Sequence, residues 1–237
     1  MKIGGLQKVS LVDYPDVIAA VIFVTGCNFR CPFCFNKDLV LGKLPLIRST
    51  KVIDFLKKRK RVLDGVVISG GEPTLQPDLE DFIRQIKKLG FKIKLDTNGA
   101  KPEVLQKLIK KHLLDYVAVD FKTILEDYPK ITKSNIVNLG AKIKKTLEIL
   151  ASSGVDFELR TTVVPGIHDK EILVEMAHQI NQLVTHNSQP TNWFLQTFQP
   201  KTCLNPKFTK IKPYSKIEMD KFLTVVKKII PQTKLRE

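Results

Sequence analysis

The sequence has few of the residues that build zinc sites and disulfide frameworks: 4 cysteines and 4 histidines in 237 residues. The histidines form no pair at the short spacing of zinc fingers. No apolar run approaches the roughly 18–20 residues of a membrane-crossing helix, so we expect no membrane anchor. No signal peptide precedes the first apolar run. We therefore expect a cytoplasmic chain, in which thiols stay reduced and disulfides are absent.

Acidic residues are also scarce. There are 24 Asp and Glu against 39 Lys and Arg, which gives a net charge of +15. Such a balance suits an acidic protein partner or nucleic acid. The densest basic run, residues 57–61, ends a predicted helix, where cations favour the negative end of the helix dipole. It carries no interleaved aromatics, so a solvated helix end explains it better than nucleic acid, which stays open.

Three of the four cysteines lie within eight residues, as Cys27, Cys31 and Cys34, directly after the apolar run 18–24. An iron–sulfur cluster normally takes four thiolates, so three at this spacing predict a [4Fe–4S] cluster with one iron left for a small molecule. Gly26 permits a tight approach of the backbone and Pro32 prevents a helix, which suits a loop that wraps a cluster.

Zinc is the main alternative for these thiols. A structural zinc site needs four ligands, and the remaining cysteine, Cys203, stands alone far downstream. We interpret Cys203 as a bystander. A zinc-stabilised nucleic-acid-binding protein without catalysis remains a remote alternative.

Short apolar runs alternate with segments of helical periodicity along the chain, and 43% of the residues are hydrophobic. The alternation predicts a parallel sheet covered by helices. The predicted strands are 18–24, 65–69, 92–96, 116–120, 156–164 and 193–198. The predicted helices are 50–61, 78–89, 102–112, 138–153, 170–184 and 215–230.

Six strand–helix units are too few for a closed eight-unit barrel. We therefore predict an α/β fold with a partial (β/α)6 TIM-like open barrel of parallel strands, in a single domain over residues 1–237. Residues 1–17 contain a double glycine and an Asp-Tyr-Pro-Asp turn signal, which predict an N-terminal β-hairpin. The partial barrel spans 18–200, and 201–237 form an extension with a C-terminal helix.

Polar residues follow five of the six predicted strands, and in barrel enzymes the chemistry gathers at these strand ends. Paired glycines let bare backbone approach a ligand, and a carboxylate that ends a buried strand needs a cation or a polar ligand nearby. Each feature alone is also compatible with a tight turn, a helix cap or an ion pair. The residues are Gly70, Gly71, Glu72, Asp96, Thr97, Asp120, Lys122, Arg160, Gln196 and Gln199.

The cysteine triad followed by Gly70-Gly71-Glu72-Pro73 resembles the radical S-adenosylmethionine superfamily. Over most of the chain the sequence is similar to the activating enzymes of glycyl radical enzymes. Residues 5–15 resemble the opening segment of anaerobic ribonucleoside-triphosphate reductase activating proteins. The resemblance implies that one electron from the cluster cleaves S-adenosylmethionine to methionine and a 5′-deoxyadenosyl radical, which removes a hydrogen from the substrate.

The resemblance also implies roles for individual residues. Cys27, Cys31 and Cys34 would ligate the cluster, and the glycine pair with Glu72 would receive the methionine amino group through backbone. Asp96, Thr97 and Asp120 match a monovalent-cation site beside the cofactor carboxylate. The remaining implied cofactor contacts are Phe33 near adenine, Asn36, Lys122 and Arg160, with Thr162, Gln196 and Gln199 in the adenosine pocket. The sequence departs from the family where Phe35 replaces the usual histidine and where Gln199 stands at a late position that carries histidine in some activators.

The implied partner is a glycyl radical enzyme, with anaerobic ribonucleotide reductase favoured. A flavodoxin or ferredoxin would supply electrons, and opposite charge would speed that encounter. No second cysteine-rich insert appears, so one cluster is expected. An enzyme that modifies a small molecule, a peptide or tRNA remains the nearest alternative.

Overall fold

The computed structural model describes residues 1–184 and 191–236. Residues 185–190 and 237, which fall inside the predicted domain ranges, lie outside the described residues. The chain folds as two compact units, each described by itself. Unit 1 comprises Met1–Asn28, Asp38–Thr97 and Glu103–Ala118. Unit 2 comprises Phe29–Lys37, Asn98–Pro102 and Val119–Glu237.

Unit 1 is built on four strands. They are β1 (Ile3–Ser10), β2 (Ala19–Val24), β3 (Gly65–Gly70) and β4 (Lys92–Thr97). Strand β3 runs parallel to both β2 and β4. Strand β1 pairs antiparallel with β2, which corrects one detail of the expected N-terminal hairpin. The hairpin exists, but its second strand is β2, because residues 11–18 form the turn and leave a single strand before it.

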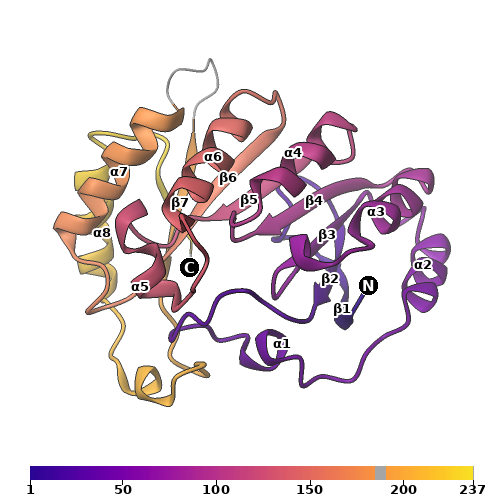
Figure 1. The fold of residues 1–237 in the computed structure, drawn as a ribbon, viewed down its shortest axis with the longest axis horizontal. Helices are drawn as coiled ribbons and strands as arrows, with labels where there is room; N and C mark the ends of the chain where they lie inside the picture. The colour runs from indigo at the N-terminus through magenta and orange to yellow at the C-terminus, as the bar shows by residue number, and fades with distance from the viewer. Residues whose placement is uncertain (185–190, 237) are drawn as a thin grey trace. The chain divides into compact units, whose positions relative to one another are not determined.

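The three predicted helices of unit 1 follow its strands, together with one short helix and one 3-10 turn that were not predicted (Figure 1). They are α1 (Lys37–Leu41), α2 (Ser49–Lys58), the 3-10 turn η1 (Pro73–Leu75), α3 (Leu79–Lys88) and α4 (Pro102–Lys110). Helix α3 buries one apolar stripe, Leu79, Phe82, Ile83 and Ile86, and packs against β4. Its opposite face carries Glu80, which lies within ion-pair distance of Arg84 on α3, Lys107 on α4 and Lys111 just after α4.

Unit 2 contains β6 (Asp156–Val163), β7 (Asn192–Thr197) and β8 (Lys234–Arg236), paired in parallel. Strand β5 (Tyr116–Asp120) begins in unit 1 and ends in unit 2. Helices α6 (Leu139–Ala151), α7 (Lys170–Val184) and α8 (Lys216–Val226) pack one against the next. Shorter elements are η2 (Leu125–Asp127), α5 (Tyr128–Thr132) and η3 (Pro206–Lys210).

Hydrogen-bonded neighbours follow chain order from β1 to β8 among the described strands, and the sheet is mostly parallel. This confirms the predicted α/β class, and all six predicted strands and six predicted helices are present within a few residues. The short α1, α5 and β8 were missed because none is long enough to show a hydrophobic period. In the described ranges, no helix has the length and apolarity to cross a bilayer.

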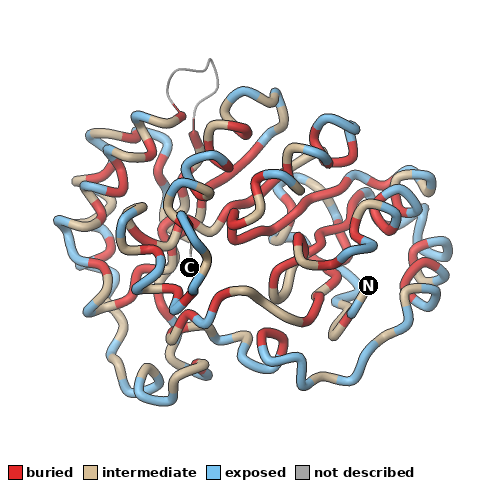
Figure 2. The backbone as a smooth tube through the Cα atoms, viewed as in Figure 1, coloured by how far each residue is buried: buried red, intermediate tan, exposed pale blue. Residues whose placement is uncertain are grey.

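The strands are the most buried elements of both units, as Figure 2 shows. Three charged side chains of the described strands are buried with them: Lys94 and Asp96 on β4 and Glu158 on β6. Glu158 accepts two hydrogen bonds from Arg236 of β8, each of 3.0 Å. Each of these buried charges is paired, as the cost of desolvating an ion requires.

Candidate functional site

The glycine pair after β3 clamps the backbone that leads into the cysteine loop. The N–H of Gly71 donates to the carbonyl of Val24, and the N–H of Glu72 donates to the carbonyl of Gly26, each at 2.8 Å. A Cβ on Gly71 would lie 2.0 Å from the Gly26 oxygen, and one on Gly70 would lie 2.5 Å from Val24 backbone atoms. Gly70 also has a φ of +114°. Only glycine fits both positions, because the two backbones touch.

Gln76 completes this clamp. Its Nε2 donates to the carbonyl of Thr25 at 3.0 Å, and its Oε1 accepts from the N–H of Lys2 at 2.9 Å. The carbonyls of residues 24, 25 and 26 are therefore all hydrogen-bonded immediately before Cys27. Cys27 itself is half-buried, with its Sγ 3.9 Å from Oδ1 of Asn28. Sequence reasoning missed Gln76, although its place just after Gly-Gly-Glu-Pro was a usable signal.

The Glu72 side chain forms hydrogen bonds within the turn that follows β3. It is fully buried, and its Oε1 accepts two hydrogen bonds from Thr74. One comes from the backbone N–H at 3.0 Å and the other from the side-chain hydroxyl at 2.5 Å. The hydroxyl of Thr97, at the end of β4, donates to the same oxygen at 2.7 Å. This carboxylate therefore ties the β3 turn to the end of β4. The backbone of Glu72 is also bonded, because its N–H donates to Gly26 and its carbonyl accepts from the N–H of Leu75.

Asp96 has a cation on its own strand. Its Oδ1 lies 3.0 Å from Nζ of Lys94, and its Oδ2 accepts from Ser69 Oγ at 2.9 Å. Lys94 is only 1% exposed, and it also donates to the carbonyl of Asp13 at 2.6 Å. Its ammonium lies 5.8 Å over the ring of Tyr116. The buried Lys94 thus neutralises a carboxylate that the sequence analysis assigned to a cation site.

In unit 2, Asp120 lies between two cations at the end of β5. Its carboxylate is 3.1 Å from Nζ of Lys122 and 2.9 Å from a guanidinium nitrogen of Arg160. Burial raises the pKa of this carboxyl, but the two positive charges outweigh it and bring the pKa down to about 2. The side chain remains 37% exposed, so this charged group is accessible.

Lys122 also interacts with the cysteine loop. Burial lowers the pKa of its ammonium, but the negative charges of Asp120, Cys31 and Cys34 raise it above its ordinary value. In turn, burial raises the pKa of the Cys34 thiol, while Lys122 and the backbone N–H of Asn36 lower it. The Lys122 charge favours the thiolate form, which is the form that ligates iron, but burial outweighs it and leaves the pKa of Cys34 above its ordinary value.

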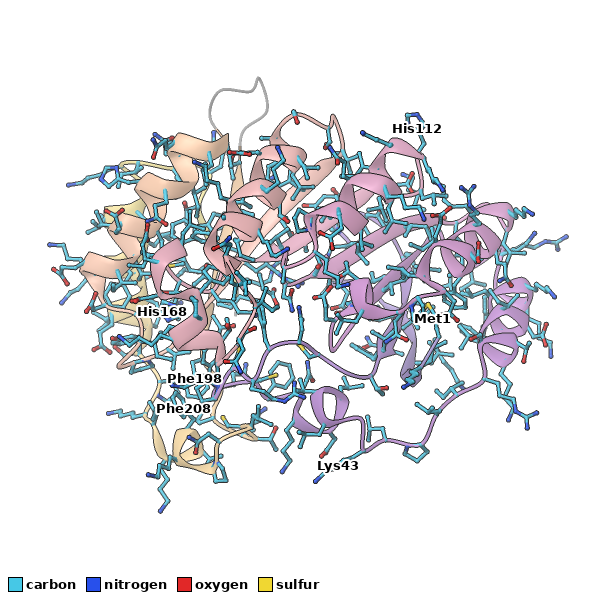
Figure 3. All side chains as sticks on the ribbon, viewed as in Figure 1. Met1, Lys43, His112, His168, Phe198 and Phe208 are labelled. Atoms are coloured by element: carbon cyan, nitrogen blue, oxygen red, sulfur yellow. The ribbon has the colours of Figure 1, made fainter. Side chains whose placement is uncertain are left out.

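The backbone of Lys122 is held by two buried side chains. Its N–H donates to Tyr128 Oη at 3.0 Å, and its carbonyl lies 2.8 Å from Nε2 of His168. The N–H of Val164 donates to Nδ1 of His168 at 3.0 Å, so Nε2 carries the ring proton and donates to the Lys122 carbonyl. Burial lowers the pKa of His168 to about 4, which keeps the ring neutral. Figure 3 labels His168, which the sequence analysis did not assign to the site.

The remaining predicted contacts lie in unit 2. Phe33 is buried, and its ring centroid lies 6.5 Å from that of Phe208, which Figure 3 labels. Thr162 of β6 is in register with Gln196 of β7, so the structure brings these two together. Gln199 follows β7 and is exposed.

The cysteines are divided between the units, with Cys27 in unit 1 and Cys31 and Cys34 in unit 2. None of the four cysteines forms a disulfide. Among residues 1–184 and 191–236, no three His, Cys, Asp or Glu side chains are arranged around a common metal position. The donor chemistry nevertheless suits an iron–sulfur cluster, because three thiols share one loop and the Lys122 ammonium offsets the charge of two of them.

Comparison with known sequences identifies relatives. The sequence profile of the Radical SAM superfamily matches residues 21–177. A Methanocaldococcus jannaschii protein, named provisionally as a glycyl-radical enzyme activating enzyme, is 34% identical over 99% of this chain and 95% of its own length. The pyruvate formate-lyase-activating enzyme of Clostridium pasteurianum is 30% identical over 77% of each chain. A Pyrococcus horikoshii protein, named provisionally as a GTP 3′,8-cyclase, is 26% identical over 78% of this chain and 62% of its own.

A solved structure agrees on the fold. Streptococcus suis SuiB bound to S-adenosylmethionine has a TM-score of 0.68 and 18% identity, covering 92% of this chain and 50% of its own. At this identity the likeness supports the fold alone.

Proposed function

The chain belongs to the radical S-adenosylmethionine superfamily, and we propose that it is the activating enzyme of a glycyl radical enzyme. The observation that carries this proposal is the 34% identity to a provisionally named activating enzyme along 99% of the chain. The three thiols, two of them beside the Lys122 ammonium, supply the chemistry that such an enzyme needs. In this proposal residues 1–237 act as a single radical S-adenosylmethionine domain.

In the proposal Cys27, Cys31 and Cys34 hold a [4Fe–4S] cluster. When bound, the cluster supplies the electron that cleaves the sulfonium of S-adenosylmethionine to methionine and a 5′-deoxyadenosyl radical. The clamp on residues 24–26 fixes the backbone from which Cys27 projects, so that the first thiol keeps its position.

The cofactor would be bound by groups at the strand ends. The backbone of Gly70 and Gly71 would receive the amino group, and Lys122 and Arg160 would attract the carboxylate by charge. Adenosine would be received by Phe33, Asn36, Thr162, Gln196 and Gln199. We assign no role to a monovalent cation, because Asp96 and Asp120 are already ion-paired with Lys94 and with Lys122 and Arg160.

We propose that the substrate is one glycine Cα–H of the partner enzyme, with anaerobic ribonucleoside-triphosphate reductase as the partner. That choice rests on residues 5–15, whose sequence resembles the opening segment of its activating proteins. A flavodoxin or ferredoxin would deliver the electron, and the net charge of +15 would attract such an acidic donor.

The test is an anaerobic reconstitution with iron and sulfide. S-adenosylmethionine and a strong reductant are added, and 5′-deoxyadenosine is measured with and without purified anaerobic ribonucleoside-triphosphate reductase. We expect cofactor cleavage, together with a glycyl radical doublet in the electron paramagnetic resonance spectrum of the partner. Cleavage without a doublet on any glycyl radical enzyme would disprove the assigned substrate class, and no cleavage at all would disprove the mechanism.

Cysteine variants provide the matched control. Changing Cys27, Cys31 or Cys34 singly to alanine should abolish bound iron or turnover, because each removes one cluster ligand. Cys203→Ala should retain both. Loss of iron in the Cys203 variant would show that the ligand assignment is wrong.

A small-molecule substrate is the second candidate, favoured by the 26% identity to the provisionally named GTP 3′,8-cyclase. Incubating the reconstituted protein with GTP in place of the partner separates the two. Formation of a cyclised nucleotide, coupled to 5′-deoxyadenosine, would favour this candidate.

A further inference from the structure

A segment that follows β7 runs alongside the cysteine loop within unit 2. Residues 202–205 run antiparallel to residues 32–35. Their hydrogen bonds show this, because residues later in the first segment bond to residues earlier in the second. The contacts are Thr202 Oγ1 to the Phe35 carbonyl at 3.0 Å, Leu204 N–H to the Cys34 carbonyl at 2.8 Å, and Asn205 N–H to the Pro32 carbonyl at 2.9 Å.

This alignment places Cys203 beside Cys34. Cys203 lies between the residues that bond to Phe35 and to Cys34, so Cys34 is its neighbour across the pair. Thr202 and Leu204, the two neighbours of Cys203 in the sequence, both bond to the backbone of residues 34–35. Cys203 is therefore held against the cysteine loop beside Cys34, and a disulfide between them would need Cα atoms about 4.4–6.8 Å apart.

The two thiols also share an environment. Cys203 is 3% exposed and Cys34 is half-buried. Burial raises the pKa of Cys203, and the charge of Cys34 raises it further. Cys34 is the more exposed of the two thiols, so it is the one that an oxidant reaches first.

We propose that Cys203 is the resolving thiol of Cys34: when the cluster is absent, the two form a reversible disulfide. An oxidised low-molecular-weight disulfide such as oxidised glutathione is the oxidant. The Cys34 thiolate attacks one of its sulfurs, and one thiolate leaves. Cys203 then attacks the mixed disulfide at Cys34, and the second thiolate leaves. Two protein thiols lose two electrons and two protons, and the oxidant becomes two thiols.

The consequence is protection of a cluster ligand. A cysteine without a resolving partner proceeds from sulfenic to sulfinic acid, which is irreversible for most proteins, whereas a disulfide is returned by a thiol reductant. The Cys34–Cys203 bridge would keep Cys34 recoverable after cluster loss. This proposal gives a role to Cys203, which the sequence analysis interpreted as a bystander.

The test uses the full chain without cluster and without S-adenosylmethionine, so its outcome is independent of the proposed function. The reduced, iron-free protein is treated with oxidised glutathione, alkylated and weighed intact. We expect two labelled thiols in place of four. Trypsin should then release the peptide of residues 31–37 linked to that of residues 202–207, since both are bounded by Lys or Arg.

Two variants identify the partner thiol. Cys31→Ser should still give the linked peptides, because Cys34 remains. Cys203→Ser should lose the link and keep its remaining thiols alkylatable or glutathionylated. A bridge between Cys31 and Cys34, which one backbone bond of 3.1 Å already holds in a turn, would overturn the proposal. Loss of two thiols in Cys203→Ser without the added mass of glutathione would overturn it too.

Recovery of iron is the functional readout. Wild-type apoprotein exposed to hydrogen peroxide, then reduced with dithiothreitol and reconstituted, should regain its iron, whereas Cys203→Ser should regain much less. Both proteins should bind the same iron when peroxide is omitted. Equal recovery in the two proteins after peroxide would show that the bridge protects nothing.

Discussion

The two units differ in how far a carboxylate at a strand end is buried and paired. In unit 1, Asp96 is buried beside Lys94, which is 1% exposed and donates to a backbone carbonyl as well. In unit 2, Asp120 is 37% exposed between Lys122 and Arg160. Asp96 and Glu72 are closed into sets of protein partners, whereas Asp120 and its two cations remain open to a ligand.

This difference suggests that the Asp96 pair stabilises the fold, whereas the Asp120 pair is placed to bind a ligand. Buried ion pairs contribute little net stability, but losing one partner is costly because it leaves an uncompensated buried charge. Exposed pairs contribute little to stability but keep their charges available to a ligand. The buried pair of unit 1 therefore supports the structure, while the pair of unit 2 keeps a charge accessible.

The strongest test of this contrast is Lys94→Met. It leaves the Asp96 carboxylate buried without its cation, so we expect the free energy of unfolding to fall by about 3–5 kcal/mol. Chemical denaturation measures it. Lys122→Met is the matched control in unit 2 and should cost clearly less, because the Asp120 carboxylate keeps Arg160 and solvent. Equal losses would show that the two pairs are equivalent.

The pH dependence of unfolding tests the hydrogen bonds of His168. Its pKa is about 4 in the folded chain and about 6.5 when unfolded, so between these values the unfolded state binds the extra proton. The contribution of His168 to stability is complete above pH 6.5 and is lost as pH falls toward 4. The loss should reach about 3 kcal/mol.

His168→Gln provides the comparison, because its side chain does not titrate in this range. Thermal or denaturant unfolding across pH 4–7 should show a weaker pH dependence for the variant than for the wild type. Parallel curves would contradict the assignment of a neutral buried ring.

Gly71→Ala tests the clamp on the cysteine loop. The new Cβ would lie 2.0 Å from the Gly26 carbonyl oxygen, so the loop backbone must move. We expect a destabilisation of about 1–3 kcal/mol and a loss of bound iron after reconstitution. Gly5→Ala is the control in the same unit, because its Cβ would meet only Phe23 at 3.4 Å or more. Iron content equal to that control would exclude a role for the clamp.

The smallest effect on stability is expected for Asp120→Asn. The carboxylate is exposed, so removal of its charge should change the free energy of unfolding by no more than about 1 kcal/mol. S-adenosylmethionine binding to the reconstituted protein should change more, because Lys122 and Arg160 lose the charge that orients them. A large loss of stability with unchanged binding would reverse the contrast between the units.

The sequence predicted the elements well because long apolar runs and amphipathic helices carry their own signal. The cysteine spacing identified the candidate cluster ligands, and Gly70 and Gly71 were found as a motif. Their tight packing against residues 24–26 was not predicted, because it depends on two backbones meeting from distant positions. Gln76 and His168 were missed for the same reason, because each bonds to backbone far along the chain. Tyr128 bonds to the nearby backbone of Lys122, but no residue pattern indicates that contact.

The sequence alone determined the α/β class, the three-thiol loop and the polar strand ends, because period, spacing and residue type are local properties. Tertiary structure decided which charges are satisfied internally and which are open, as in Asp96 with Lys94 and Asp120 with Lys122 and Arg160. It also decided that Cys203 lies opposite Cys34, because pairing between residues 32–35 and 202–205 leaves no pattern in either segment.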